Sequence, residues 1–191
     1  MTRVAMVLAA GESKRLGQPK QLLQHEGETL VRRAVRKSRE AEASHVIVVT
    51  GAFAEDISAE LRAVECQIVH NENWQTGMGH SIACGAEAIA STLPTCELVL
   101  LQLCDQPFIP VAHLKSLLAD SELTSSIAAT SYLDSTHGPP ACFPARYLDA
   151  LSNLSGTRGA KSLLATEKIN FIACEEAAMD IDVVEDLRHL Q

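Results

Sequence analysis

The sequence lacks the residue spacings that mark common metal and redox sites. Its 191 residues include six cysteines and seven histidines, but no Cys-x-x-Cys pair and no His-Glu-x-x-His segment. Four of the cysteines lie in apolar surroundings, where cysteine commonly serves as a small core residue. The sequence therefore favours free thiols over disulfides and disfavours a zinc site.

Long apolar runs are also absent. No run approaches the roughly 20 residues that a helix needs to cross a bilayer. Met1-Thr2-Arg3 leads directly into a short apolar segment, without the features of a secretory signal. We therefore expect a cytoplasmic protein that has no membrane partner.

Positive charge is in deficit, because the formal net charge is −8 at neutral pH. This balance argues against non-specific binding of nucleic acid. One basic cluster is present early in the chain, and we interpret it as the solvated face of a helix. Its members are Arg32, Arg33, Arg36, Lys37 and Arg39.

Hydrophobic patterning indicates one α/β domain, residues 1–191, with helices on both faces of a mostly parallel sheet. Apolar, β-branched runs predict buried strands, and longer amphipathic segments predict the helices between them. Strands are expected at 4–8, 45–50, 66–70, 97–104, 127–132, 140–143 and 169–174. A short helical turn is expected at 19–24, with helices at 28–43, 54–64, 80–91, 111–120, 146–153 and 159–167. The segment 134–139 is expected to form a turn.

The loop after the first strand has the composition of a polyphosphate-binding loop. Parallel sheets bind ligands beyond the carboxyl ends of their strands, and this loop follows the strand at 4–8. Gly11 and Gly17 allow positive φ and a close approach of backbone N–H groups to an anion. Three cations lie in the same short segment: Lys14, Arg15 and Lys20.

The spacing within this loop excludes the two commonest nucleotide-binding loops. Five residues separate Gly11 from Gly17, and Gln18-Pro19 follows, so the loop is not a Walker A motif. The Gly-x-Gly-x-x-Gly fingerprint of dinucleotide-binding proteins is absent as well.

Asp105 directly follows the most apolar predicted strand. A carboxylate at the end of a central parallel strand lies at the ligand-binding edge of the sheet, and carboxylate oxygen is the ligand that Mg²⁺ prefers. The alternative is that Asp105 only forms a turn or caps a helix before Pro107.

Leu8 to Lys20 resembles the opening signature of the MobA-like nucleotidyltransferases, Leu-Ala-Ala-Gly-x-Ser-x-Arg-hydrophobic-Gly-x-x-Lys, at every fixed position. Trp74, Gly77, Met78 and Ser81 resemble that family's second motif, and Asp105-Gln106-Pro107 its metal-binding triplet. The resemblance implies a Rossmann-like nucleotidyltransferase fold with an NTP-binding half at about 1–110 and an acceptor-binding half at about 111–191. The residues then expected to bind nucleotide are Leu8, Ala9, Ala10, Gly11, Ser13, Lys14, Thr50, Gly51, Gly77, Met78 and Ser81.

Three later segments resemble the family's remaining motifs, and two of them depart from the usual pattern. Gly138-Pro139-Pro140 matches the Gly-x-Pro motif. In the loop 156–161, Thr157 replaces the usual acid. Asp180-Ile181-Asp182 matches the closing motif, although Val183-Val184 stands where Thr-Pro is usual. The resemblance implies acceptor binding by Gly138, Pro140, Gly156, Arg158 and Gly159.

The resemblance is nearest to the molybdenum cofactor cytidylyltransferase branch. It implies transfer of CMP from CTP to the terminal phosphate of molybdopterin, with Arg15, Lys20 and Asp105 as catalytic residues. Asp105 and Asp182 would hold Mg²⁺ or Mn²⁺. A molybdoenzyme chaperone or an apo-molybdoenzyme is a possible protein partner.

Two alternatives remain open from the sequence. The chain could transfer another nucleotide or use another acceptor, such as GTP with molybdopterin or an NTP with a sugar phosphate. It could also be a non-catalytic module that binds a nucleotide or carries the cofactor, an alternative that the departures at Thr157 and Val183-Val184 leave open.

Overall fold

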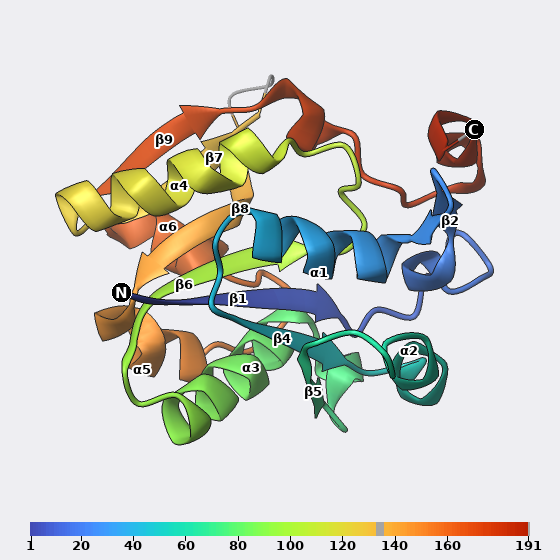
Figure 1. Ribbon diagram of the computed structural model, residues 1–191, viewed down its shortest axis with the longest axis horizontal. Helices are drawn as coiled ribbons and strands as arrows, with labels where there is room; N and C mark the ends of the chain where they lie inside the picture. The colour runs from blue at the N-terminus through green and yellow to red at the C-terminus, as the bar shows by residue number, and fades with distance from the viewer. Residues whose placement is uncertain (133–135, 191) are drawn as a thin grey trace.

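Seven strands form one central sheet in the computed structural model, which describes residues 1–132 and 136–190 (Figure 1). The strand order is β5-β4-β1-β6-β8-β7-β9. All neighbouring pairs are parallel except those of β8 with β6 and β7, so the expected mostly parallel sheet is confirmed. The bounds are β1 (Thr2–Ala9), β4 (His45–Thr50), β5 (Gln67–His70), β6 (Cys96–Leu103), β7 (Ile127–Ser131), β8 (His137–Pro144) and β9 (Ile169–Ala173).

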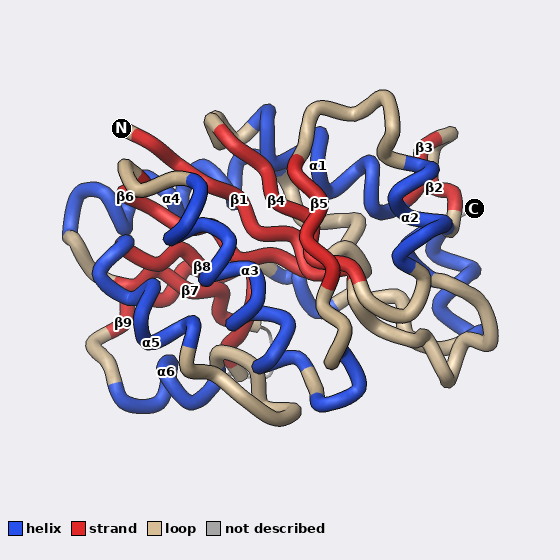
Figure 2. The backbone as a smooth tube through the Cα atoms, turned by 90° about the horizontal axis from the view of Figure 1, so that it is seen from below, coloured by secondary structure: helices blue, strands red, loops and turns tan. Residues whose placement is uncertain are grey.

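Helices cover both faces of this sheet, which gives the three layers expected from the sequence. One face packs against α1 (Leu30–Glu40), α2 (Ala54–Glu60) and α4 (Val111–Thr124). The other packs against α3 (Met78–Thr92), α5 (Leu148–Ser152) and α6 (Lys161–Thr166). Figures 1 and 2 show α1 and α3 on opposite sides of the strands.

The first strand shows why the sheet is buried on both faces. Ala5 and Val7 belong to the core on the α1 side, whereas Val4, Met6 and Leu8 belong to the core on the α3 side. A strand whose successive side chains enter two cores must be apolar at every position, as this run is. The same double burial applies to β4 and β6, which flank β1.

Several element boundaries differ from expectation. The helix expected from residue 28 begins at Leu30, because Glu28–Thr29 forms β3 and pairs with β2 (Gln24–His25). Thr29 then caps α1, its hydroxyl accepting a hydrogen bond from the backbone N–H of Arg32. The helix α2 ends at Glu60 rather than at residue 64.

Other differences lie in the second half of the chain. The strand expected at 140–143 begins at His137, so Gly138, which was expected in the turn, lies within β8 together with Pro140. Of that expected turn, 134 and 135 lie outside the described residues. The expected helix at 146–153 begins as the 3₁₀ turn Ala145–Tyr147, and the one at 159–167 starts later, because Gly159 has a φ of +56°.

The basic cluster of α1 is not simply a solvated face, which corrects the interpretation from sequence. The ammonium of Lys37 donates to the carbonyl oxygens of Pro107 and Ile109, both at 2.6 Å, and Arg33 donates to that of Pro107 at 3.1 Å. Burial, followed by the charges of Arg33 and Arg36, lowers the pKa of Lys37 to about 8. These side chains fix the loop that follows Asp105.

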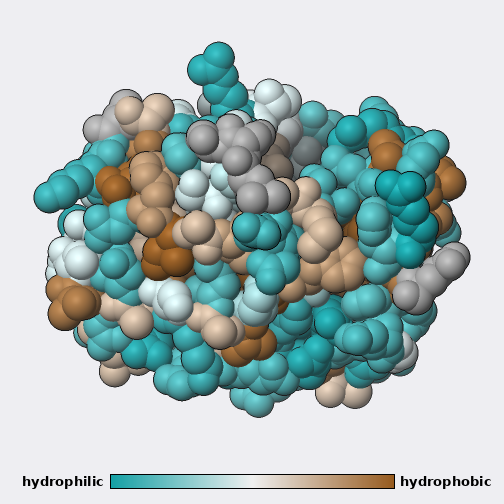
Figure 3. Space-filling model, turned by 90° about the horizontal axis from the view of Figure 1, so that it is seen from above, coloured by the Kyte–Doolittle hydropathy of each residue, from teal (hydrophilic) through white to brown (hydrophobic). Residues whose placement is uncertain are grey.

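The six cysteines are free thiols, as expected. Within the described ranges, no helix has the length and apolar character to cross a membrane. On the face seen in Figure 3, hydrophobic residues lie in small groups between hydrophilic ones. At the far end of the chain, the 3₁₀ helix Val184–Leu190 lies beside the β2–β3 hairpin, where the Leu190 carbonyl is 3.1 Å from Nδ1 of His25.

Candidate functional site

The adjacent parallel strands β1 and β6 bring two of the predicted site segments together. Both strands end at the same edge, and the backbone N–H of Cys104 donates to the carbonyl of Leu8 at 3.3 Å. The glycine-containing loop after β1 therefore lies beside Asp105. The sequence placed both segments at the ligand-binding edge, and the strand order makes them neighbours.

A buried glutamine that sequence reasoning missed holds the loop after β1. Gln21 is fully buried, and its side-chain amide donates to the carbonyls of Ala9 at 3.0 Å and Gly11 at 2.7 Å. Its carbonyl oxygen has no hydrogen-bond partner among the described residues. No pattern in the single sequence marks Gln21 for this role.

The loop reaches its shape through one of the two expected glycines and through Ser13. Gly17 adopts a φ of +72°, as expected, but Gly11 does not adopt a positive φ. Ser13 instead has a φ of +55°, and its hydroxyl accepts a hydrogen bond from the backbone N–H of Lys20 at 3.1 Å. Ser13 thus joins the two ends of the loop.

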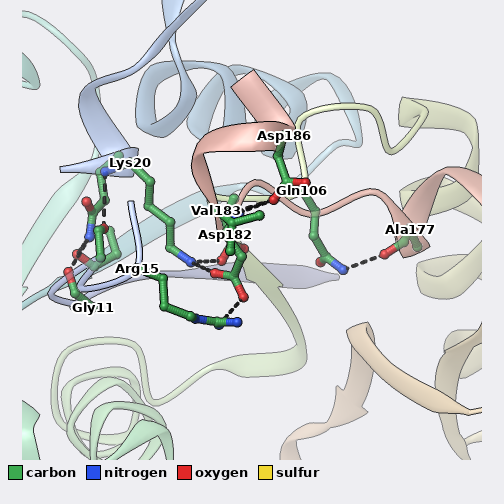
Figure 4. Close-up of polar contacts among 12 residues, drawn as sticks. Gly11, Arg15, Lys20, Gln106, Ala177, Asp182, Val183 and Asp186 are labelled. Atoms are coloured by element: carbon green, nitrogen blue, oxygen red, sulfur yellow. Dashed lines mark hydrogen bonds and ion pairs between the residues drawn. The ribbon is translucent and has the colours of Figure 1, made fainter. Parts of the chain in front are cut away.

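Four charged residues from three distant segments meet at one end of this loop, and Figure 4 shows three of them, Arg15, Lys20 and Asp182. The ammonium of Lys20 pairs with Oδ2 of Asp105 and lies 2.7 Å from Oδ1 of Asp182. The guanidinium of Arg15 pairs with the other oxygen of Asp182. All predicted catalytic and metal-binding residues therefore lie together.

Backbone hydrogen bonds hold the closing segment of the chain, in which Val183-Val184 stands where Thr-Pro is usual. The backbone N–H of Ile181 donates to the carbonyl of Asp105 at 2.9 Å, which ties the segment to the end of β6. The carboxylate of Asp186 accepts hydrogen bonds from the N–H groups of Asp182 and Val183 at 2.8 and 2.9 Å. These contacts hold Asp182 against Lys20 (Figure 4).

The electrostatics of this cluster are dominated by burial and by close opposite charges. Burial alone would lower the pKa of Lys20, but the charge of Asp105 and hydrogen bonds to both carboxylates raise it above its ordinary value. Burial also acts to raise the pKa of Asp182, yet Lys20 and Arg15 bring it below its usual range. Burial and the charges of the other two carboxylates raise the pKa of Asp180.

A cavity of about 310 Å³ opens beside the cluster. Most residues expected to bind nucleotide line it: Leu8, Ala9, Ala10, Gly11, Lys14, Gly77, Met78 and Ser81. Sequence reasoning did not assign Glu12, Gln21, Gln75, Leu103 and Cys104 to the site, and it named Trp74 only as part of a motif; all six also line the cavity. Small residues form part of the wall, which suits a flat ring and its phosphates: Ala9, Ala10, Gly11, Gly77 and Ser81.

Three residues expected to bind nucleotide do not line this cavity: Ser13, Thr50 and Gly51. Thr50 is fully buried, and a Cβ on Gly51 would lie 2.6 Å from both the carbonyl oxygen of Ala10 and the Cβ of Trp74. Gly51 therefore lets Trp74 pack against the β1 loop. Thr50 and Gly51 therefore lie behind the residues that line the cavity.

A second cavity of about 440 Å³ shares Met78 and Leu103 with the first. Of the residues expected to bind the acceptor, only Arg158 lines it. Its other polar residues are Gln106, Tyr132, Lys161 and Asp180, none of which was assigned to the acceptor. Burial raises the pKa of Tyr132 to about 12, so the hydroxyl stays protonated at neutral pH.

The four remaining acceptor candidates have structural contacts instead. The carbonyl of Gly156 accepts a hydrogen bond from the N–H of Gly79 at 2.8 Å. A Cβ on Gly138 would lie 2.6 Å from the Tyr132 hydroxyl, and one on Gly159 would lie 2.8 Å from the sulfur of Met78. The carbonyl of Pro140 accepts from Thr130. These positions shape the second cavity without lining it.

Comparison with known proteins gives a family match over most of the chain. The model of the MobA-like NTP transferase domain matches residues 5–171. The chain is 35% identical to nicotine blue oxidoreductase of Paenarthrobacter nicotinovorans, over 97% of this chain and 94% of that protein. It is 30% identical to the purine catabolism protein PucB of Bacillus subtilis, over 91% of this chain and 86% of that protein.

Solved structures agree with these matches. The crystal structure of Rv0371c from Mycobacterium tuberculosis H37Rv superposes with a TM-score of 0.85 at 28% identity, covering 99% of this chain and 96% of that one. A structure of Rv0371c in complex with manganese gives a TM-score of 0.80 at 26% identity, covering 100% and 98%. The fold is thus shared along nearly the whole chain.

Proposed function

This chain belongs to the MobA-like NTP transferase family and is a nucleotidyltransferase of that family, and from this premise we propose that it transfers CMP from CTP to the terminal phosphate of molybdopterin, releasing pyrophosphate. The observation that carries the proposal is the junction of the two cavities. One is walled by the glycine-containing loops, the other is lined by Arg158 and Lys161, and the two share Met78 and Leu103. A nucleotide in the first and an anionic acceptor in the second would meet there.

The proposed reaction needs no nucleophile from the protein. An oxygen of the acceptor phosphate forms a bond to the α-phosphorus of CTP, while the bond from that phosphorus to the β-phosphate oxygen breaks. The electron pair of the broken bond leaves on pyrophosphate, whose charge Arg15 and Lys20 would oppose. Because an ionised phosphate carries no proton on the attacking oxygen, the acceptor requires no general base.

The residues fit a divalent metal ion at the same place. Oxygens of Asp105 and Asp182 converge on a single cation, the Lys20 ammonium, and Oδ1 of Asp105 is buried with no hydrogen-bond partner among the described residues. The described part of the chain holds no group of three His, Cys, Asp or Glu side chains that could bind a metal. Mg²⁺ commonly uses one or two carboxylates and takes its other ligands from water and substrate phosphates.

We propose that Asp105 and Asp182 hold Mg²⁺ or Mn²⁺. The ion would neutralise part of the negative charge where the two anionic substrates meet. The relative solved in complex with manganese supports a divalent ion in this family.

We propose that the size of the first cavity, about 310 Å³, sets the base selectivity. A purine would have to enlarge a wall formed by Ala10 and the loop 77–79. We expect kcat/KM for CTP to exceed that for GTP by about tenfold or more. Equal use of the two nucleotides, or preference for GTP, would assign the protein to guanylyl transfer.

The deciding experiment incubates the protein with each of four α-labelled NTPs and either molybdopterin or a panel of sugar phosphates. Label transfer from CTP to molybdopterin is the expected result, and transfer to a sugar phosphate would replace the proposed acceptor. Nucleotide binding without any label transfer would favour a non-catalytic carrier. Because one relative is named an oxidoreductase, oxidation of NADH with a dye acceptor is measured in parallel.

The same proposal names a protein partner. The dinucleotide product would pass to a molybdoenzyme chaperone or directly to an apo-molybdoenzyme. Co-purification of either with the product-loaded protein tests this step.

A further inference from the structure

The two cations proposed to bind phosphate are already engaged with the two carboxylates proposed to bind metal. Lys20 contacts both Asp105 and Asp182, and Arg15 contacts the second oxygen of Asp182. The Lys20 and Asp105 side chains are only 14% and 13% exposed, so water screens this pair weakly. The ammonium therefore lies where the carboxylate oxygens converge.

A divalent ion and this ammonium cannot share that position. The carboxylates of Asp105 and Asp182 both contact the Lys20 ammonium, so their oxygens lie close together around it. Without a nearby cation, ionised carboxylates this close and this sheltered would repel one another strongly. Lys20 supplies that cation within the chain itself.

We propose that Lys20, assisted by Arg15, is an internal counter-ion that occupies the metal position until a triphosphate draws it away, so that metal and nucleotide bind cooperatively. The inference rests on the proposed function for the identity of the triphosphate. Lys20 lines the same cavity as Gly11 and Lys14, so phosphates bound along that loop would lie within reach of its flexible four-carbon side chain. Moving the ammonium onto phosphate would free the carboxylate oxygens for the ion.

This arrangement has a thermodynamic consequence. If the triphosphate removes a competitor of the metal, it must raise metal affinity, and the metal must raise nucleotide affinity by the same factor. The free protein then binds the ion weakly, and the ion enters together with the nucleotide. A site built only from carboxylates and water would instead bind the ion without nucleotide.

The test measures Mn²⁺ binding by electron paramagnetic resonance, with no turnover involved. Wild type, Lys20→Met and Lys20→Gln are titrated with Mn²⁺ alone and with Mn²⁺ plus α,β-methylene CTP, which cannot be cleaved. Lys14→Met is the matched control, because Lys14 lies in the same loop but is 78% exposed and pairs with Glu12 at 3.1 Å. Circular dichroism verifies the fold of each variant.

We expect wild type to bind Mn²⁺ at least tenfold more tightly with the analogue than without it. Both Lys20 variants should bind Mn²⁺ alone at least tenfold more tightly than wild type, with much of the dependence on the analogue lost. Lys14→Met should match wild type when no nucleotide is present. Adding Asp105→Asn to Lys20→Met should abolish the gain, because the ion then loses its buried ligand.

Equal Mn²⁺ affinity of wild type and folded Lys20 variants, without nucleotide, would overturn the proposal. An equal gain in Lys14→Met would also overturn it, since the effect would then be general charge removal. Failure of the proposed function gives a different pattern. Label transfer would be absent for every NTP, while the gain of Mn²⁺ affinity in Lys20→Met would still establish the counter-ion role.

Discussion

At the residue scale, Lys20 connects most of the site. It reaches carboxylates that lie 85 and 162 positions away along the chain, and its own backbone N–H closes the loop at Ser13. Lys20→Met and Arg15→Met should each lower kcat by about 10²-fold or more at saturating CTP, the range expected for losing a preorganised donor to the transition state.

Steady-state kinetics with CTP and molybdopterin provide the measurement for these variants. Lys161→Met, which removes a cation from the second cavity, serves for comparison and should mainly raise KM for the acceptor. Near-wild-type kcat in Lys20→Met or Arg15→Met would remove the loop from the mechanism.

Lys37 gives a pH prediction that is independent of catalysis. Its pKa in the folded protein is about 8, below the ordinary value of 10.5. Between these values the unfolded chain binds more protons than the folded one, so the contribution of Lys37 to the free energy of unfolding rises as pH increases from about 8 to 10.5. Below pH 8 the lysine is charged in both states, and its contribution is at its lowest.

Urea unfolding of wild type and Lys37→Met from pH 7 to pH 10 tests this directly. The advantage of wild type over the variant should grow with pH, because the other titrating groups are common to both proteins. A constant difference would show that Lys37 has an ordinary pKa in the folded protein, and a difference that shrinks as pH rises would show that its pKa is raised; either result contradicts the prediction.

The sequence identified the charged residues of the site better than the residues that position them. Arg15, Lys20 and Asp105 stood out because phosphate and metal chemistry requires their charges, whereas Asp182 was identified through the resemblance to the closing motif of the family. Gln21 did not stand out, since a fully buried glutamine bonded to two carbonyls has no pattern in one sequence. The burial of Lys37 could not be predicted either, because helical periodicity does not show which loop packs against a given face of the helix.

At the element scale, the start of α3 is locked to the loop 155–157. The N–H of Gly79 donates to the carbonyl of Gly156, and a Cβ on Gly79 would lie 2.5 Å from the carbonyl oxygen of Ser155. Gly79→Ala should therefore lower the free energy of unfolding by about 1–3 kcal/mol, the usual cost of overpacking. It should also raise KM for the acceptor, because the displaced loop leads to Arg158.

Gly11→Ala is the matched control for this change in stability. A Cβ there meets nothing within 4 Å, and Gly11 does not adopt a positive φ. Measured by urea unfolding, the free energy of unfolding of Gly11→Ala should lie within about 0.5 kcal/mol of that of wild type. If Gly79→Ala were as stable as Gly11→Ala, the loop 155–157 would move aside for the added methyl group without a measurable loss of stability.

Element boundaries were predictable where side-chain periodicity extended over several residues. The buried strands β1, β4 and β6 followed from continuous apolar runs. The β2–β3 hairpin did not, since strands of two residues each carry no period. The early start of β8 was hidden by Gly138-Pro139-Pro140, which is typical of a turn although it lies within a strand.

At the scale of the whole molecule, the site depends on the order of strands in the sheet. The last strand, β9, lies three places from β6, so the segment after it must run back along the edge before Ile181 can bond to Asp105. The sequence predicted that both carboxylates would lie at one edge, but not this order. Side-chain patterns determine which strands are buried, whereas pairing partners depend on the packing of the complete sheet.

A ligand at this site would therefore bridge segments from both ends of the chain, and its binding should stabilise the folded protein as a whole. With Mg²⁺ and α,β-methylene CTP at a hundred times Kd, the free energy of unfolding should rise by about 2.7 kcal/mol. For a chain of this size that corresponds to a rise in Tm of roughly 5–10 °C. Differential scanning fluorimetry measures the shift with each ligand alone and with both together.

Asp105→Asn separates the contribution of the metal from that of the nucleotide. The amide is nearly isosteric with the carboxylate but lacks the charge, so the metal-dependent part of the Tm shift should disappear while any shift from nucleotide alone remains. Asp182→Asn should show a smaller loss, because Asp182 is the more exposed of the two carboxylates, at 27% against 13%. If Asp105→Asn gave the full shift with both ligands, Asp105 would only shape the turn before Pro107, and the metal would bind elsewhere.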